Sequence, residues 1–573
     1  MVALITWSVK ACFDAPVILI IMQQYLNWQV FIALGGILCL VIYLNAINII
    51  TSQEHPIEVT PIGRSIYREG IVDLPVSFNP LLDTNNPIDQ DVVHFVFEGL
   101  LREDGFGNLE PVLAKDWHMS EDGTMYEFEL HQNIHWSDGK PFTSDDVIFT
   151  LNLLKNPDFP SNPTFKQAWK NVGIKQIGHT IQFTLENHLP VFPYYTTFKI
   201  LPKHILEDVP IEDFLTHDFN LSPIGTGPFK LVEATDKHIL LNVNEYHLRT
   251  RPHMSEIEFN IYHDTNALIQ AFVEEEIDAF GQYTPQVQHQ VKSNSITQTS
   301  YLSHANLYNA SLPRYSIIYF NLLSKDTLSF FQEADIRHAL FMAIDRQAII
   351  DELLTSQAYM ANGPIPLWNW AYNHNQLYPT HDTEQAFKLL DQMGWVDTDG
   401  DSVRDKDGVP FTFTMLVVDD DEQIAIAKQI SQYWHEIGID STVEPAYETL
   451  TSRLQNHDFE AALVEIKLLG DPNLYPFWHQ SQIEEGQNFA GWDNSEASTI
   501  LVEAQQAIEK SDRIMHYLEF QRIFATELPA IVLHYPVYNY LVHDKVKNVQ
   551  LTPLNTPADR FRTFSEWYIK LEE

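Results

Sequence analysis

The sequence predicts a mixed α/β fold. Apolar and polar residues alternate, as in half-buried strands, at residues 180–185 and 239–243. Apolar residues recur every three or four positions, as on one face of a helix, at residues 336–354, 383–393, 422–437 and 497–508. Because 573 residues exceed what one ordinary core holds, we expect two or three domains.

The N-terminal region predicts one transmembrane helix at residues 30–50, between a segment at 1–29 and a polar tether at 51–61. No charged residue occurs from Ala15 to Gln53, and an apolar run of this length crosses a bilayer at about 1.5 Å per residue. A cleaved signal peptide is the alternative, but the basic start and small-residue cleavage site that it needs are poorly matched. A lipoprotein is disfavoured because Leu38 precedes Cys39.

The charge and cysteine content exclude some classes of protein. Asp and Glu outnumber Lys and Arg by 77 to 35, for a formal charge of -42, which argues against nucleic acid as a partner. A solubilising acidic surface is the favoured interpretation. Cys12 and Cys39 both lie in the N-terminal region, so the large soluble body cannot hold a disulfide.

A strand, a turn and a capped helix are predicted between residues 122 and 151. Asp122-Gly123 is a turn, and residues 124–130 alternate so that Tyr126, Phe128 and Leu130 share one face. Asp138-Gly139 is a second turn. Thr143, followed three residues later by Asp146, is typical of a capping box that starts a helix with Val147, Phe149 and Leu151 facing inward.

This succession resembles the signature of the extracellular solute-binding proteins of family 5, the peptide and nickel receptors of ABC importers. Further segments match that family in order and spacing, and the resemblance covers the chain from about Ile57 onward. The matching segments are residues 113–117, 136–147, 224–230, 336–346 and 470–472.

The resemblance implies a two-lobed fold like that of periplasmic binding proteins. The first lobe is expected at residues 62–311, with an inserted subdomain at 94–217. The second lobe is expected at 312–535, and the chain returns to the first lobe at 536–573. Residues 316–321 have the β-rich character expected of a crossover between lobes.

No constellation of catalytic residues is present in the sequence. There is no G-x-S-x-G elbow, H-E-x-x-H helix, Walker loop or dinucleotide fingerprint. In the segment Gly225-Thr226-Gly227-Pro228 the proline removes the amide that a phosphate cradle would use. His131 and His135 lie in a strand-and-turn context that does not give a helical metal-ligand pair. We therefore expect neither enzymatic activity nor a cofactor.

An acidic segment at residues 397–408 is a candidate calcium loop. Carboxylates at alternating positions can converge on a cation as in an EF-hand. However, Ser402 stands where that loop needs glycine, and Gly408 stands where it needs a bidentate glutamate. These departures favour an acidic surface loop, with calcium as the alternative. The possible ligands are Asp397, Asp399, Asp401 and Asp405.

The resemblance also implies a ligand cleft between the lobes. Peptide-binding members carry an aspartate three residues before an acid-proline pair, where it pairs with the peptide amino terminus. This chain has Leu468 three residues before Asp471-Pro472. Because a buried ammonium without a partner is costly, either another carboxylate binds the amine or the ligand has no buried free amine. Ordinary packing is the alternative for each aromatic residue among the further cleft candidates, which are Asn79, Gly470, Trp368, Trp370, Trp478 and Phe489.

The predicted function is that of a monomeric receptor, tethered to the membrane by one helix, with its body outside the cytoplasm. It would capture peptides or peptide-like solutes, close its lobes by a hinge motion, and deliver the solute to ABC permease subunits. An oligosaccharide or a nickel chelate is the alternative ligand. A sensory or scaffold receptor without a transport role is the alternative function.

Overall fold

The computed structural model divides into two units, Met1–Gly63 and Arg64–Glu573. It describes residues 65–570 except 83–85, 162, 249–250, 285–286, 289–303, 324–328, 377 and 469–470. The predicted transmembrane helix at 30–50 and both cysteines therefore lie outside the described residues. Within the described ranges, no helix combines the length and apolar character needed to span a bilayer.

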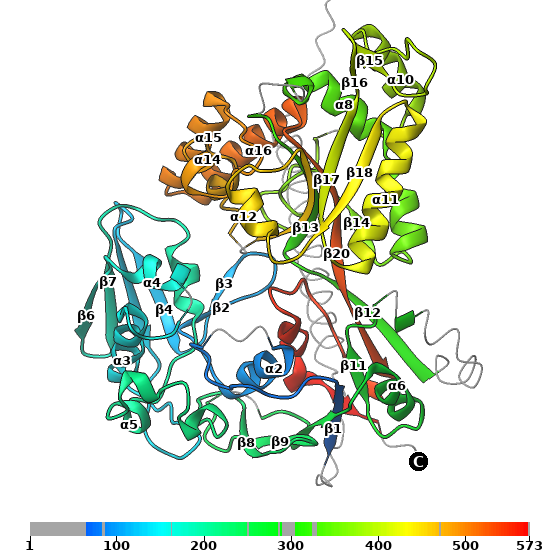
Figure 1. Cartoon of the computed structure of the whole chain (residues 1–573). Helices are drawn as coiled ribbons and strands as arrows, with labels where there is room; N and C mark the ends of the chain where they lie inside the picture. The colour runs from blue at the N-terminus through cyan, green and yellow to red at the C-terminus, as the bar shows by residue number, and fades with distance from the viewer. Residues whose placement is uncertain are drawn as a thin grey trace, which may run out of the picture. The chain divides into compact units, whose positions relative to one another are not determined.

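One large sheet runs through the second unit, and helices pack against it (Figure 1). Its strands lie in the order β18-β17-β19-β13-β20-β11-β1-β10-β9-β8, with β12 and β14 also paired to β20. The strands are β1 (Ile66–Ile71), β8 (Phe229–Ala234), β9 (His238–Val243), β10 (Glu256–Ile261), β11 (Ala279–Gly281), β12 (Ala305–Ser311), β13 (Arg314–Phe320), β14 (Ala358–Met360), β17 (Thr412–Val418), β18 (Asp440–Ala446), β19 (Ala461–Lys467) and β20 (Ala530–His543).

Strand β20 belongs to both halves of this sheet. Its first part pairs with β13, with Ala530 opposite Tyr319, and its last part pairs with β11, with Val542 opposite Ala279. We call β1 to β12, β21 and β22, with their helices, the first lobe. We call β13 to β19, with α8 to α16, the second lobe, which includes the short hairpin of β15 (Asp405–Lys406) and β16 (Val409–Pro410). The sequence of β20, rich in Val and Tyr, suits a strand that is buried along most of its length.

The second lobe has helices on both faces of its sheet. Alternate residues of β13 face opposite sides, so Ile318 packs with the core under α8, α10 and α11, and Ile317 packs with the core under α13, α15 and α16. Asp420 caps α11 by accepting from the amides of Glu422 and Gln423. The helices are α8 (Ala334–Ala343), α9 (Arg346–Ala348), α10 (Thr383–Gln392), α11 (Asp421–Glu436), α12 (Leu450–Gln455), α13 (Tyr475–Trp478), α14 (Gln482–Glu485), α15 (Ser495–Gln506) and α16 (Lys510–Glu527).

The first lobe contains a second sheet of four strands in the order β4-β5-β7-β6. The predicted strand at 124–130 is confirmed as β5, and the predicted capping box is present at Thr143 and Asp146. Val147 and Leu151 are buried, and Phe149 is half-buried. The remaining elements include α2 (Pro87–Val96), β2 (Leu101–Glu103), β3 (Leu109–Pro111), β4 (Ala114–Met119), β5 (Met125–Leu130), α3 (Ser144–Lys155), α4 (Pro163–Trp169), β6 (Gly173–Ile177), β7 (Thr180–Thr184), α5 (Lys203–Leu206), α6 (Thr265–Val273), β21 (Val546–Lys547) and β22 (Tyr568–Ile569), and the short 3-10 turns η1 (Phe192–Thr197) and η7 (Pro557–Phe561).

One predicted helix is wrong in its extent. The expected continuous helix at 336–354 is α8, followed by an extended residue at Ile344, then α9 and a π-helical turn at Ile349–Leu353. The break occurs because Asp345 caps a new helix at the amide of Ala348, and Arg346 turns inward to donate to the carbonyls of Ala361 and Val532. The predicted helices at 383–393, 422–437 and 497–508 are confirmed as α10, α11 and α15.

Candidate functional site

Polar side chains of the two lobes meet where α16 faces the turn between β2 and β3. Lys510 Nζ, at the start of α16, donates to Asn108 Oδ1 of that turn at 2.9 Å. The same ammonium lies 4.8 Å from the centre of the Trp370 ring. This contact joins residues 402 positions apart in the chain. It therefore places α16 and the β2–β3 turn on opposite walls of the junction between lobes.

A buried ion pair lies directly behind this contact. Arg513 Nη2 donates to both carboxylate oxygens of Asp471, at 2.8 and 2.7 Å, and the Asp471 side chain is 1% exposed. Burial alone would lower the pKa of Arg513, but the charge of Asp471 raises it above its ordinary value. The guanidinium carbon is also 5.2 Å from the Trp370 ring, a cation–π distance. Trp370 is thus a wall shared by Lys510 and Arg513.

The opposite wall supplies Glu103 and Tyr194. Burial, with smaller contributions from Asp559, Asp104 and Asp471, raises the pKa of Glu103 to about 8. Burial, followed by the charges of Asp471 and Glu103, raises the pKa of the Tyr194 phenol. Glu103 Oε1 and Arg513 Nε are both buried, and neither has a hydrogen-bond partner within the described part of the chain. An acceptor of one lobe and a donor of the other are therefore left unsatisfied at this junction.

Leu468 also lies at the junction, in a more apolar part. It is 8% exposed and shares a small void of about 20 Å³ with Trp368 and Pro472 of the second lobe and with Gly105 and Asn555 of the first. A void of this size has room for about one water molecule. The structure thus brings Leu468 and Trp368 together between the lobes.

The other predicted cleft residues lie in different surroundings. Trp478 has no exposed surface and packs edge-on against Phe524 at 4.8 Å. Asn79 is 1% exposed and uses its side chain within the first lobe, donating to Asn220 Oδ1 at 3.1 Å. Phe489 packs against Tyr319 and lines a separate pocket of the second lobe. Gly470 lies outside the described residues.

A pocket of about 360 Å³ lies in the first lobe at the carboxyl ends of β1 and β11, with a buried ionic network in its wall. Arg560 donates to Glu69 Oε1 at 3.0 Å and to Asp91 Oδ1 at 2.7 Å. The hydroxyls of Tyr67 and Tyr540 each donate to Glu69 Oε2 at 2.6 Å. Burial raises the pKa of both carboxyls, and Arg560 opposes this change. Two buried carboxylates thus share one buried cation beside this pocket.

Sequence reasoning missed the ion pair and its surroundings. Lys510, Arg513 and Tyr517 recur at helical spacing, which predicts that they share one helix face. Nothing in that spacing indicates the partner Asp471, which lies 42 residues earlier. Glu103 carried no signal either, because its raised pKa depends on burial by segments that are distant in the sequence.

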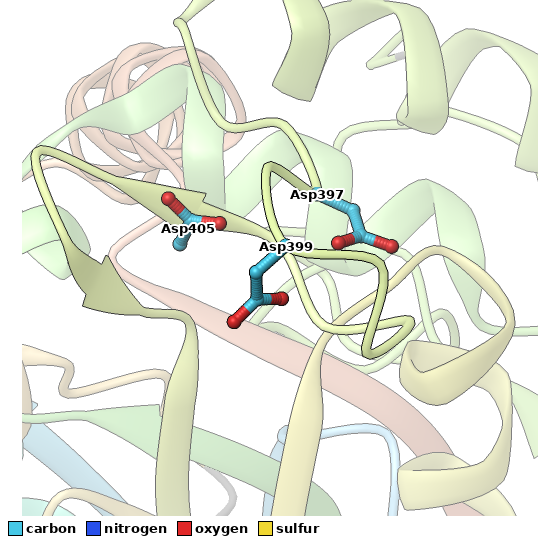
Figure 2. A group of neighbouring side chains, drawn as sticks. All are labelled: Asp397, Asp399 and Asp405. Carbon is cyan, nitrogen blue, oxygen red and sulfur yellow. The ribbon is translucent and has the colours of Figure 1, made fainter.

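The acidic segment forms an exposed loop between α10 and the short strand β15 (Asp405–Lys406) (Figure 2). Carboxylate oxygens of Asp397, Asp399 and Asp405 lie within 4.8 Å of one another, and Asp401 is not in this group. Asp397 accepts from the amides of Gly400 and Ser402, at 2.7 and 3.1 Å. With one ligand oxygen from each carboxylate, the group supplies three of the about six to eight oxygens that calcium prefers, and these carboxylates already stabilise the loop's own turns.

The sequence matches the family model described as bacterial extracellular solute-binding proteins, family 5 Middle, over residues 108–484. Among curated proteins, it is 26% identical over 501 residues to the oligopeptide-binding protein AppA of Bacillus subtilis. That match covers 84% of this chain and 88% of the relative.

Solved structures of similar proteins share the fold. The structure of Bacillus subtilis AppA in complex with a nonapeptide matches with a TM-score of 0.65 at 24% identity, covering 88% of this chain and 99% of that one. The structure of NikZ from Campylobacter jejuni in complex with Ni(L-His) matches with a TM-score of 0.66 at 23% identity, covering 88% and 100%. These matches confirm the predicted α/β two-lobed fold of the periplasmic binding proteins.

Proposed function

Because the chain belongs to the bacterial extracellular solute-binding proteins of family 5, we propose that it captures peptides or peptide-like solutes and delivers them to the permease of an ABC importer. The relatives are solute-binding proteins, so the prediction that this chain is not an enzyme is confirmed. The oligopeptide-binding relative supports peptides as the ligand class. In this proposal the protein acts as a monomer outside the cytoplasm.

One observation carries this proposal: unsatisfied polar groups of opposite lobes face the same junction. Glu103 Oε1 is an acceptor on the first lobe, and Arg513 Nε is a donor on the second. A peptide group offers one N–H donor and one C=O acceptor, so a peptide backbone lying between the lobes can satisfy both. A ligand that contacts both lobes at once also favours their closed arrangement.

The chemistry around Leu468 limits how such a peptide binds. Leu468 places an apolar side chain where peptide-binding relatives are expected to hold an amine, and Asp471 is already paired with Arg513. We propose that the ligand is held mainly through its backbone groups, with no carboxylate pairing with its amino terminus at this position. A nickel chelate is the second candidate, supported by the likeness to the nickel-binding structure.

We further propose that residues 30–50 anchor the protein in the membrane through the tether at 51–61. We also propose lobe boundaries near residues 311 and 535, with residues 94–217 as the inserted subdomain. The return of β20 from β13 to β11 supports the second boundary. Osmotic release of soluble proteins from intact cells would test the anchor, since an anchored body stays cell-associated after this treatment.

The ligand itself can be identified by native mass spectrometry of the protein as it is purified from cells. We expect additional mass that corresponds to short peptides. A panel of peptides and nickel chelates should then raise the melting temperature, because a ligand that binds only the folded state stabilises it. A protein that carries no solute and shows no thermal shift with any member of the panel would contradict the proposed function.

Leu468→Asp tests the placement of the ligand. A carboxylate at this position should pair with a free amino terminus and strengthen binding of free-amino peptides by about tenfold, relative to N-acetylated versions of the same peptides. The acetylated peptides are the matched control, because they keep every backbone group and lose only the charge. Equal effects on the two sets of peptides would show that the pocket lies elsewhere.

A further inference from the structure

A pocket of about 690 Å³ lies in the second lobe at the carboxyl ends of β17 and β19. We call it the second-lobe pocket, and it is lined by side chains from both strands, from the start of α11, and from α12. In open parallel α/β sheets, ligands bind beside the carboxyl ends of the strands. Lys467 ends β19 and lines this pocket, and the next residue, Leu468, lies between the lobes. Neighbouring residues of one strand end therefore line this pocket and the junction between the lobes.

Acidic side chains dominate the polar lining of this pocket. Asp420, Glu422 and Glu465 contribute three carboxylates, and Lys467 contributes one ammonium. Arg314, which is outside the lining, pairs with Glu465 at 3.2 Å. Partial burial, followed by the charges of Asp420 and Glu465, raises the pKa of Glu422, and Arg314 only partly offsets this. The pocket thus keeps an excess of negative charge after its cations are counted.

The start of α11 would by itself favour an anion, because helix N-termini carry a partial positive charge. Here a carboxylate of the protein itself already binds the amides at the start of α11. Asp420 Oδ1 accepts from the amides of Glu422 and Gln423, at 3.0 and 3.1 Å, and the first turn also carries Asp421 and Glu422. The local charge is therefore negative in spite of the helix terminus.

An independent observation at Gln423 points to a ligand with N–H donors. Gln423 is 8% exposed and lines the pocket, and its side-chain oxygen accepts no hydrogen bond from any residue that the structure describes. A buried acceptor without a donor costs about 1–3 kcal/mol. A donor from a bound ligand would remove this cost.

The rest of the lining is apolar and suits an aliphatic stem. Leu454, Ile466 and Phe489 are all buried residues of the second-lobe core that line the pocket. Lysine and arginine side chains combine such a stem with a charged head that donates several hydrogen bonds. We infer that the second-lobe pocket binds the cationic side chain of a lysine or arginine residue in the captured peptide. This inference rests on the proposed function, since it names the class of peptide that the same site selects.

Competition between two peptide pools tests this inference on the full-length protein. One pool contains short peptides with a single lysine, and the other is identical except that norleucine replaces lysine. Norleucine keeps the aliphatic stem and removes the charge. Peptides retained by the protein are counted by mass spectrometry, and we expect about tenfold enrichment of the lysine forms. The Glu422→Gln and Glu465→Gln double variant should reduce this enrichment to less than about threefold, without weakening the norleucine peptides.

Glu496→Gln is the matched control, because Glu496 lies on α15 with a side chain that is 67% exposed, outside the pocket. This variant should keep the full enrichment. Thermal melts of all variants without peptide establish that they are folded. Equal retention of the two pools by the unchanged protein, or an enrichment that survives in the double variant, would overturn the inference while leaving the proposed function intact. Retention of neither pool would refute the proposed function, and this inference with it.

Discussion

Arg560→Met should strongly destabilise the protein at neutral pH. The Arg560 side chain is 3% exposed, as is that of Asp91, and Glu69 has no exposed surface. Methionine fills much of the same volume but leaves two buried carboxylates without their shared cation. Breaking a buried ion pair by removing one partner costs about 3–5 kcal/mol, and here one substitution removes the partner of two anions. We therefore expect a loss of at least about 4 kcal/mol in the free energy of unfolding at pH 8.

The decrease in the free energy of unfolding caused by Arg560→Met should become smaller as the pH falls. Burial raises the pKa of Glu69 and of Asp91 in the folded protein, and Arg560 opposes that rise, so the variant should raise both values further. A carboxyl whose folded-state pKa exceeds its unfolded-state pKa binds more protons when folded. Its stabilising contribution is present at low pH and is lost as the pH rises through the folded-state pKa. We expect the deficit to fall to about 1–2 kcal/mol at pH 5.

Urea unfolding, followed by tryptophan fluorescence and circular dichroism, measures the free energy of unfolding at pH 8 and at pH 5. Trp567, whose ring centre lies 5.9 Å from that of Tyr67, places a fluorescent reporter beside the network. Arg522→Met is the matched control, because Arg522 is 52% exposed and pairs with Glu519 at the surface, where little change is expected. A deficit below about 1 kcal/mol at pH 8, or one that is equal at the two pH values, would refute this reasoning.

Asp471→Asn should lower the free energy of unfolding by about 3 kcal/mol, because it leaves Arg513 buried without its anion; adding Arg513→Met should recover most of the loss in the same urea assay. A single-variant loss under about 1 kcal/mol would show that the pair is effectively solvated. Glu103→Gln should stabilise the protein by about 1–2 kcal/mol at pH 8 and progressively less toward pH 5. The reason is that Glu103 has a pKa of about 8 in the folded protein, so the folded protein becomes less stable as the pH rises toward that value. Thermal melts that show a gain independent of pH would count against this. Calcium at millimolar concentration should give no binding heat in calorimetry, because the acidic loop already satisfies its carboxylates internally; a heat that Asp399→Ala abolishes would show a calcium site instead.

Local patterns predicted much of the secondary structure correctly, because their causes are local. The capping box of Thr143 and Asp146 needs only three residues of spacing, and the structure contains it. The apolar period at 336–354 was misleading for the same reason. It continues through Ile349 and Ile350, which are buried beyond the break at Ile344, where Arg346 reaches carbonyls in β20 and at Ala361. A period in the sequence records burial and does not show where the helix axis changes.

The junction between the lobes was predictable only in part. Leu468 was singled out as a departure from the family pattern, and it does lie between the lobes. Its charged neighbour Arg513 was not identified, because the pairing with Asp471 arises when α16 packs beside a segment that is distant in sequence. The unsatisfied atoms of Glu103 and Gln423 are likewise properties of packing, which composition and spacing do not contain.

Strand β20 is synthesised late, and strands made much earlier cannot complete their pairing until it is present. Residues 537–543 complete the pairing of β12, and residues 530–534 complete that of β13. A growing chain that stops before residue 530 would carry two sheets with open edges, and such edges invite pairing with other chains. The first lobe therefore cannot complete its sheet until the whole second lobe has been synthesised. We expect the first lobe to keep an open sheet edge, and to depend on holding factors, until this late strand emerges.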